Sequence, residues 1–418
     1  MTTEVFIAKR LRLRHGDSQG TPSLTVALVG ITLAVVIMLL SIAIVMGFKR
    51  EITDKIFHLA PHLKVTNAIL DASERHLTVN GRSVMSYIEN APAFAENVVS
   101  MSLVAEQPAI LKTAEDFKGV LMRGVRQSYD LSFLRNALTE GRLPNISDTA
   151  TVNTEVIISK TLASQLSLKC GDRIHAYFID DHARVRRVTI VGIFDTNFET
   201  FDKSTIIGSL SLLQELNQWN IDTGNYVDIR LKDPTQAPDA AYALYATLAE
   251  ASYNDNSQLT YNVTPVQESY RGFFSWLDML DMNVIIILVL MVIVAGFTLI
   301  AAMLMIVLER VRIIGELKAF GATNAQIRNI FILLTGKLIL KALIIGNIIG
   351  LGLALLQKYC HIVRLNPETY YMSFVPIHLS PVAIIALNLG IIVVAYLTLL
   401  LPGYVISSIK PAATIRFE

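Results

Sequence analysis

Charged side chains are scarce in this sequence: they make up 17% of its 418 residues, against roughly a quarter in soluble proteins. Hydrophobic residues make up 52%, so the composition excludes an ordinary soluble chain and points to a protein partly dissolved in lipid. The formal net charge is only +1, which argues against a nucleic-acid binder because such proteins need a basic surface. With only two cysteines, a disulfide-rich scaffold and a cysteine-based zinc site are also excluded.

Sequence motifs of catalysis are missing as well. The phosphate-binding loop G-x-x-x-x-G-K-[ST] does not occur, because Gly336-Lys337 is followed by Leu338 inside an apolar run. The motifs G-x-S-x-G, H-E-x-x-H and C-x-x-C do not occur either. We therefore expect a non-catalytic chain that binds no cofactor and no metal of its own.

Long apolar runs are what the sequence does contain. About 20 helical residues cross a hydrocarbon core of about 30 Å. Four runs reach that length, at 24–48, 283–308, 330–357 and 381–401. The third contains Lys337 and Lys341, which share one helical face because they lie four residues apart. Either both lysines extend to the lipid headgroups, or they face a protein interior or a substrate path.

The charges beside these runs predict how the chain is threaded. Lys and Arg gather before the first run, between the second and third, and in the tail, and short basic flanks stay in the cytoplasm. Both termini are therefore expected in the cytoplasm, and the first run is interpreted as a retained signal anchor. The predicted cytoplasmic parts are an interfacial helix at 1–23, a loop at 309–329 and a tail at 402–418; the predicted outer parts are 49–282 and 358–380.

The segment 49–282 has the mixed polarity of a water-exposed domain. Its first residues continue the first span as a polar helix, which Pro61 should stop. Alternating runs typical of strands are then interspersed with helical runs such as RSVMSYIEN. We expect a membrane α-helical protein with four transmembrane helices and a large α+β domain, of one or two lobes, between helices 1 and 2. Cys170 and Cys360 both fall outside the cytoplasm, as free thiols or as a disulfide.

The loop ERVRIIGELKAFGATNAQIRNIF, from Glu309 to Phe331, carries the functional argument. The apolar spacing from Val311 to Leu317 predicts a short amphipathic helix that Gly321 ends, with Thr323 as the N-cap of the helix that becomes span three. This helix either lies under the bilayer or is a coupling helix that inserts into a cytoplasmic motor.

The same loop resembles a known motif. Glu309-Arg310 followed by IGELKAFGA is similar to the ER-x-x-IG-x-L-[KR]-A-[LF]-GA loop of mechanotransmission-type ABC transporter permeases. Among these, the chain most resembles the lipoprotein-releasing permeases, over almost its whole length. The blocks that carry the resemblance include FIAKRLR, VMGFKREITDKIFHLAPHLKV, RRVTIVGIFDTNFETFDKS, NPETYYMSFVP and LPGYVISSIKPAATIRFE. One departure is that Met46 is followed directly by Gly47, where many members have an intervening Asn.

The resemblance implies a permease subunit of an ATP-driven complex that extracts lipoproteins from the inner membrane of a Gram-negative bacterium. It implies a cytoplasmic ABC ATPase dimer that holds ATP and Mg, a second permease copy, identical or related, and lipoprotein cargo. The residues that would couple to the ATPase are Glu309, Arg310, Arg312, Ile314, Gly315, Glu316, Leu317, Lys318, Gly321 and Ala322. The rival functions are an exporter of small amphiphiles or peptides, and an adaptor that activates a cell-wall hydrolase.

A substrate cavity is hypothesised near the outer ends of spans one and two. The apolar residues assigned to it are Val45, Met46, Phe48, Phe273, Phe274, Trp276, Tyr370 and Tyr371. The same residues could instead form an aromatic belt that faces lipid. Family members that dock a periplasmic lipoprotein carrier use a protruding hairpin. The corresponding stretch, Ile174 to Ile190, is short, with only Asp180 to Ala183 as its turn, which argues against docking through such a hook.

Overall fold

The computed structural model describes residues 22–68, 77–146, 153–179, 183–254, 260–309 and 311–408. The chain divides into a helical unit, Met1–Glu51, Trp276–Arg364 and Phe374–Glu418, and a sheet unit, Ile52–Ser275 and Leu365–Ser373. Four sequence predictions fall wholly or largely outside the described residues: the interfacial helix at 1–23, Arg310, the turn at 180–182 and the end of the tail at 409–418.

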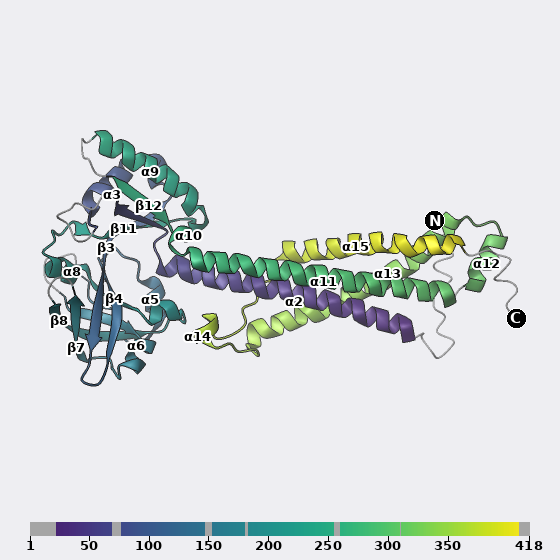
Figure 1. Ribbon diagram of the computed structural model, residues 1–418, viewed down its shortest axis with the longest axis horizontal. Helices are drawn as coiled ribbons and strands as arrows, with labels where there is room; N and C mark the ends of the chain where they lie inside the picture. The colour runs from purple at the N-terminus through teal and green to yellow at the C-terminus, as the bar shows by residue number, and fades with distance from the viewer. Residues whose placement is uncertain are drawn as a thin grey trace. The chain divides into compact units, whose positions relative to one another are not determined.

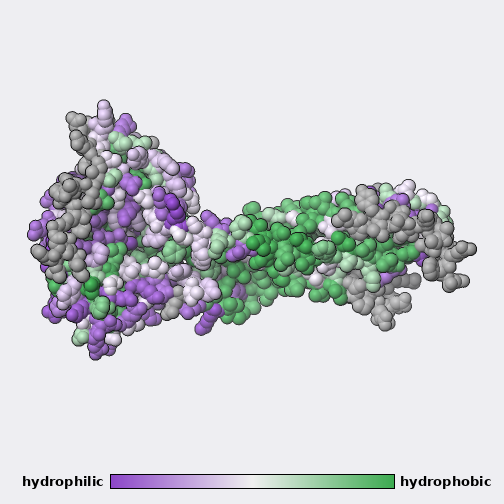
Figure 2. Space-filling view, in the orientation of Figure 1, coloured by the Kyte–Doolittle hydropathy of each residue, from purple (hydrophilic) through white to green (hydrophobic). Residues whose placement is uncertain are grey.

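Long helices make up the helical unit (Figure 1). They are α2 (Pro22–Leu59), α11 (Arg271–Glu309), α13 (Asn324–Cys360) and α15 (Pro381–Ser408), with the short α12 (Val311–Ala319) after α11. The four long helices are apolar enough to cross a membrane. Figure 2 shows apolar residues over most of the visible face of this unit, and polar residues over the sheet unit. The predicted fold class is therefore confirmed.

Helix α2 is longer than the apolar run that predicts it. It continues for eleven residues beyond residue 48 and ends at Leu59, two residues before Pro61. Proline lacks an N–H and clashes with the preceding turn, which accounts for the end of the helix. The residues from Ile52 onward belong to the sheet unit.

The core of the helical unit draws buried side chains from every one of its long helices. It contains Ile31 and Met38 of α2, Met303 of α11, Phe331 of α13 and Ile391 of α15. Helices α2 and α13 approach closely at Gly346, where an added Cβ would lie 2.8 Å from the Cβ of Val35. Small residues at such crossings let transmembrane backbones pack together.

An amide pair links α13 to α15 inside the apolar region. Asn347 Nδ2 donates to Asn388 Oδ1 at 2.7 Å, and Asn388 Nδ2 donates to Asn347 Oδ1 at 3.1 Å. Each amide also donates to a carbonyl of its own helix, at Leu343 and Ile384 respectively. The pair is thus satisfied on both sides, as an apolar surrounding requires.

Replacing Asn388 alone with leucine is expected to weaken this unit more than replacing both asparagines, because the single change leaves one amide oxygen without its partner. Interhelical hydrogen bonds in membranes are worth about 0.6 to 1.7 kcal/mol, so the loss should fall in that range. SDS-induced unfolding of the full chain in mixed micelles measures it. A double variant less stable than the single one would contradict the pairing.

The sheet unit is an α+β fold. Its strands are β1 (Leu63–Asn67), β2 (Val79–Asn80), β3 (Val98–Lys112), β4 (Phe117–Val125), β5 (Leu138–Gly141), β6 (Glu155–Ser159), β7 (Arg173–Ile179), β8 (Ala183–Phe194), β9 (Thr205–Ser209), β10 (Thr223–Gly224), β11 (Tyr226–Leu231) and β12 (Tyr261–Pro265). Its helices are α3 (Gly81–Glu89), α4 (Pro92–Ala95), α5 (Ser132–Asn136), α6 (Lys160–Gln165), α7 (Glu199–Asp202), α8 (Leu210–Asn217), η1 (Pro234–Gln236), α9 (Ala237–Asn254), α10 (Val266–Ser269) and α14 (Pro367–Tyr370).

One mixed sheet runs through the unit in the order β12-β1-β11-β3-β4-β9-β6-β8-β5. The long strand β3 pairs with β11 along its first half and with β4 along its second half. Strand β7 pairs with β3 and forms an antiparallel hairpin with β8, in which Ile179 lies opposite Ala183. The predicted hairpin is therefore present, and only residues 180–182 separate its strands. Cys170 and Cys360 are both free thiols.

Candidate functional site

The predicted coupling loop folds as the helix α12, followed by a turn and the start of α13. Thr323 caps α13 as the sequence predicts: its hydroxyl accepts from the Gln326 N–H, and the Gln326 side chain accepts from the Thr323 N–H. Gly321 ends the α12 segment with a φ of +91°, a conformation that favours glycine. The loop is thus a helix-turn-helix corner with a capping box at the start of α13 and a left-handed glycine after α12.

Helix α12 has one face turned inward and one turned outward. Ile314 is fully buried and belongs to the core of the helical unit, together with Ile327 and Phe331 of α13. On the outer face, Arg312 and Glu316 form an ion pair at 3.4 Å with 90% and 55% of their side chains exposed. An exposed pair of this kind contributes little to stability. The pair leaves both charged groups accessible on the outer face of α12.

Phe320 is an exposed residue of this loop that was not among the predicted coupling residues. It directly follows α12 and is 89% exposed, although a phenylalanine gains much from burial. A large apolar side chain immediately before the helix-ending Gly321 was the available signal. Of the predicted coupling residues, Ile314 and Gly315 lie inside the unit, whereas Arg312 and Glu316 are exposed. The exposed group, Arg312, Glu316 and Phe320, is called the coupling face below.

The residues hypothesised to line a cavity lie in both units. In the helical unit, Val45 and Met46 are half-buried, and Phe48 meets Trp276 edge-on with ring centroids 5.9 Å apart. Between Met46 and Phe48, the backbone of Gly47 passes so close to the Pro376 carbonyl that an added Cβ would lie 2.5 Å from its oxygen. This contact accounts for glycine at that position.

A second aromatic group lies within the sheet unit. The rings of Phe273, Tyr371 and Phe198 are mutually in contact, with centroids 5.2 to 5.6 Å apart. Phe274 packs on Phe57 at 6.2 Å, and Tyr370 is 44% exposed. Phe198 was not predicted as a site residue, although it lies in the family-like block RRVTIVGIFDTNFETFDKS. Its partners are distant in the sequence, so only the fold brings the three rings together.

A buried lysine organises the same region of the sheet unit. Lys55 is 9% exposed, and its ammonium group donates to the carbonyls of Tyr371 at 2.8 Å and Asn197 at 3.3 Å. Both acceptor residues have a positive φ, +59° and +52°, which is costly for residues other than glycine. The ammonium group of Lys55 therefore links the end of α2 to the segment before α7 and to the loop after α14.

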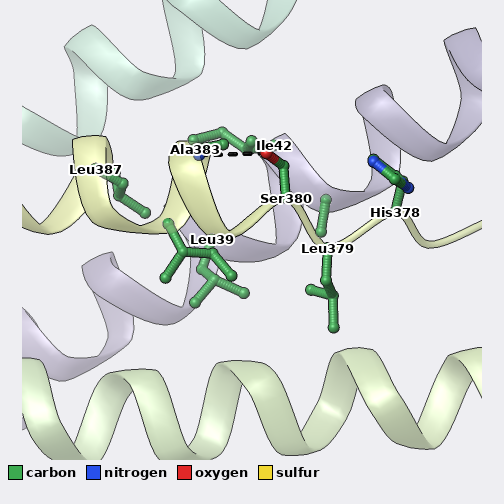
Figure 3. A pocket seen from close by; sticks show the side chains of 9 residues that line it. Leu39, Ile42, His378, Leu379, Ser380, Ala383 and Leu387 are labelled. Atoms are coloured by element: carbon green, nitrogen blue, oxygen red, sulfur yellow. Dashed lines mark hydrogen bonds between the residues drawn. The ribbon is translucent and has the colours of Figure 1, made fainter.

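An apolar pocket lies in the helical unit between α2 and the start of α15 (Figure 3). Leu39 and Ile42 of α2 face Ala383 and Leu387 of α15 across it. The lining contains no aspartate, glutamate, lysine or arginine, and its polar side chains are those of Ser380 and His378.

Two buried groups of the sheet unit have displaced pKa values. Burial and the neighbouring Arg230 lower the pKa of His62 to about 4. Burial and the neighbouring Asp195 carboxylate raise the pKa of Asp202 to about 6, against hydrogen bonds that Thr196 donates to it. At neutral pH the histidine is therefore uncharged and the carboxylate charged.

These shifts act on stability in opposite directions. The unfolded chain binds a proton at His62 below pH 6.5 and the folded chain only below about 4, so acidification through this window destabilises the fold. The folded chain binds a proton at Asp202 below about pH 6 and the unfolded chain only below 3.8, so acidification stabilises it. Each effect amounts to about 2 kcal/mol after allowance for solvent screening.

We therefore expect His62→Gln to gain stability relative to the wild type as the pH falls from 6.5 to 4, and Asp202→Asn to lose it. Glutamine keeps a donor for the Phe57 carbonyl and an acceptor for the Leu231 N–H. Thermal unfolding can be followed at Trp219 in a Trp276→Phe background, because the protein has only two tryptophans. If the stabilities of the two variants relative to the wild type changed in the same direction with pH, the opposite pKa shifts of His62 and Asp202 would be contradicted.

Comparison with known proteins gives two family matches. The MacB-like periplasmic core domain matches residues 24–246, and the FtsX-like permease C-terminal matches residues 285–411. The lipoprotein-releasing system transmembrane protein LolC of Neisseria meningitidis serogroup B is 23% identical over 414 residues, covering 94% of each chain. The protein of the same name from Xylella fastidiosa (strain 9a5c) is 22% identical, covering 94% of this chain and 93% of the relative. The solved periplasmic region of MacB from Actinobacillus actinomycetemcomitans, 14% identical with a TM-score of 0.35, covers 50% of this chain and 91% of its own.

Proposed function

This chain belongs to the family defined by the MacB-like periplasmic core domain, and on that premise we propose that it is the permease subunit of an ATP-driven complex that releases lipoproteins from the inner membrane. The observation that carries the proposal is the likeness, over 94% of the chain, to relatives named as lipoprotein-releasing system transmembrane proteins. The four apolar helices and the intervening α+β unit agree with that role.

The coupling face is where we place the ATPase. Arg312 and Glu316 offer charge to a partner, and Phe320 offers an aromatic side chain that has no apolar cover of its own. Because Ile314 anchors the same helix in the core of the bundle, a push on the coupling face would move the spans. ATP and Mg then belong to the partner ATPase, and this chain supplies no catalytic group. Both termini face the ATPase, in the cytoplasm.

Extraction of a lipoprotein requires work that the permease must transmit. A triacylated anchor buries many methylenes in the bilayer, at about 0.8 kcal/mol each. An apolar surface along the exit path offsets part of this cost. We assign that role to Phe48 and Trp276 in the helical unit and to Phe273, Tyr370 and Tyr371 in the sheet unit.

A second permease copy completes the complex. Helix α11 carries a long exposed apolar face in the single chain, including Ile286 at 60%, Leu290 at 54% and Phe297 at 68%. In the proposed complex, lipid and the second copy together cover this face. The hairpin β7–β8 has only residues 180–182 between its strands, so a soluble carrier, if one accepts the cargo, docks elsewhere than on a protruding hook.

Affinity purification of the tagged chain from mild detergent, with mass spectrometry and an ATPase assay, tests the proposal. An ABC ATPase recovered together with acylated lipoproteins is the expected result. An ATPase recovered with an outer-membrane channel would favour an exporter of small amphiphiles or peptides, and one recovered with a cell-wall hydrolase would favour an adaptor. The same purification shows whether the second permease is identical to the first.

A further inference from the structure

The C-terminal end of α2 is buried, and its carbonyl groups need partners. The last four carbonyls of an α-helix have no acceptor role within the helix. Here the Ile56 carbonyl accepts from the Ala60 N–H at 2.9 Å. The next three, of Phe57, His58 and Leu59, accept from side chains of the sheet. Every terminal carbonyl of this helix is therefore satisfied.

Arg230 of β11 holds two of these carbonyls. Its Nη1 donates to the Phe57 carbonyl at 2.6 Å and lies 3.3 Å from the His58 carbonyl oxygen, within hydrogen-bond reach. Its Nε lies 3.2 Å from Asp228 Oδ1, and its guanidinium plane approaches the ring of Tyr129. His62 adds a second hydrogen bond to the Phe57 carbonyl, at 3.1 Å. The guanidinium group of Arg230 is thus held between the α2 carbonyls, which accept its hydrogen bonds, and Asp228 and Tyr129 of the sheet unit.

Arg123 of β4 holds the third carbonyl. Its Nη1 donates to the Leu59 carbonyl at 2.9 Å, and its Nε donates to Glu106 Oε1 of β3 at 2.8 Å. The Tyr226 hydroxyl donates to the same carboxylate oxygen at 3.0 Å. Arg123 is 6% exposed, so this network is shielded from water. Cations at a helix C-terminus are favoured by the helix dipole, and the effect grows with burial.

The two arginines come from the middle of the sheet. Strands β11, β3 and β4 are neighbours in the strand order, and Arg123 lies directly opposite Glu106 in the β3–β4 register. The helix end is therefore bonded to two strands, β11 and β4, and the strand between them, β3, supplies the Glu106 carboxylate that holds Arg123. Buried ion pairs are costly and often add nothing to stability when compared with apolar packing. In this protein the arginines instead fix the orientation of the helix end, because a planar guanidinium group holds each carbonyl in one geometry.

We propose that Arg123 and Arg230 form a rigid joint through which a displacement of α2 turns the sheet of the outer domain. This inference rests on the proposed function, in which ATP-driven motion of the spans must reach the sheet unit. The arginines are positioning residues: they touch neither cargo nor nucleotide. Loss of the joint should leave the rate of ATP hydrolysis unchanged, but the hydrolysis should no longer drive lipoprotein release.

The main test variant is Asp228→Asn with Arg230→Met in the complex with its ATPase. Both charges are removed, so no unpaired charge of this pair is left buried, but the His58 carbonyl loses its donor and the Phe57 carbonyl keeps only the hydrogen bond from His62. We expect the ATPase rate to persist and lipoprotein release per ATP to fall by roughly 5- to 150-fold, the usual range of a coupling between sites. Arg142→Met is the matched control, because Arg142 pairs with Glu155 at the surface of the same unit with 58% of its side chain exposed.

A second readout reports on the joint itself. Spin labels at His58 and Val99, both exposed, are placed in a background without Cys170 and Cys360. The distance distribution should be narrow in the wild type and in Arg142→Met, and broad in the Asp228/Arg230 variant. Retained thermal unfolding at Trp219 shows that the sheet unit still folds. Unchanged distances, or full release per ATP despite broadened distances, would overturn the proposal.

A covalent rescue separates a mechanical role from a chemical one. The rings of His58 and Phe133 stack at 5.2 Å, so cysteines at these two positions can be joined by a short bifunctional thiol reagent. Joining them in the Asp228/Arg230 variant should restore release, and no restoration would count against a joint. If the wild-type complex itself releases no lipoprotein, the proposed function fails, while the label distances still decide whether the joint exists.

Discussion

Replacing Phe320 with alanine is expected to detach the ATPase from this permease while leaving its spans folded. Phe320 is 89% exposed at the tip of the coupling loop, and loss of an aromatic anchor at the centre of an interface costs about 2 kcal/mol or more, roughly 30-fold in affinity. Titration of the detergent-solubilised chain with the purified ATPase measures the change. The folded state of the spans is checked by SDS-induced unfolding.

The matched control for this change is Phe117→Ala. Phe117 is also a strongly exposed phenylalanine, at 67%, but it begins β4 in the sheet unit. Its truncation should leave ATPase affinity unchanged. Equal affinity of the Phe320→Ala variant and the wild type would mean that α12 is an interfacial helix under the bilayer, and the coupling interpretation would be dropped.

Replacing Gly346 with leucine is expected to disrupt the membrane bundle. An ideal Cβ at this position would lie 2.8 Å from the Val35 Cβ and 3.2 Å from the Thr32 carbonyl oxygen, so α2 and α13 must separate. Overpacking of a tight core costs about 1 to 3 kcal/mol, and separation of two spans adds lost contacts along their length. The midpoint of SDS-induced unfolding of the full chain should fall accordingly.

Gly352→Leu provides the comparison on the same helix. No atom lies within 4 Å of the Cβ that would be added there, and leucine is a better helix former than glycine. We expect this variant to unfold at or slightly above the wild-type midpoint. A similar loss in both glycine variants would show that the change in helix propensity or hydrophobicity, rather than the α2–α13 contact, governs stability.

The membrane part of the fold follows closely from local sequence signals. Runs of about 20 apolar residues mark spans because a helix is the structure that satisfies its backbone in lipid. The stop at Pro61, the Thr323–Gln326 capping box and the left-handed Gly321 are each decided by one or two residues. These features could therefore be predicted from the sequence without knowledge of the tertiary structure.

The features that depend on distant residues could not be predicted. The carbonyls at the end of α2 accept hydrogen bonds from arginines that lie 64 and 173 residues further along the chain, and no sequence periodicity predicts such a pairing. Phe198 joins Phe273 and Tyr371 only through the fold. Phe320 stands between the two cases: its position was visible in the motif, but its exposure required the structure.

ATP-dependent release of a triacylated lipoprotein from proteoliposomes that hold this permease, its ATPase and any second permease tests the proposed function most directly. We predict that the lipoprotein passes to a soluble apolar acceptor only when ATP and Mg are both present, and that Phe320→Ala strongly reduces the transfer at ATPase concentrations that saturate the wild type. Sustained ATP hydrolysis with the lipoprotein still in the membrane, in the wild-type complex and with acceptor in excess, would contradict it.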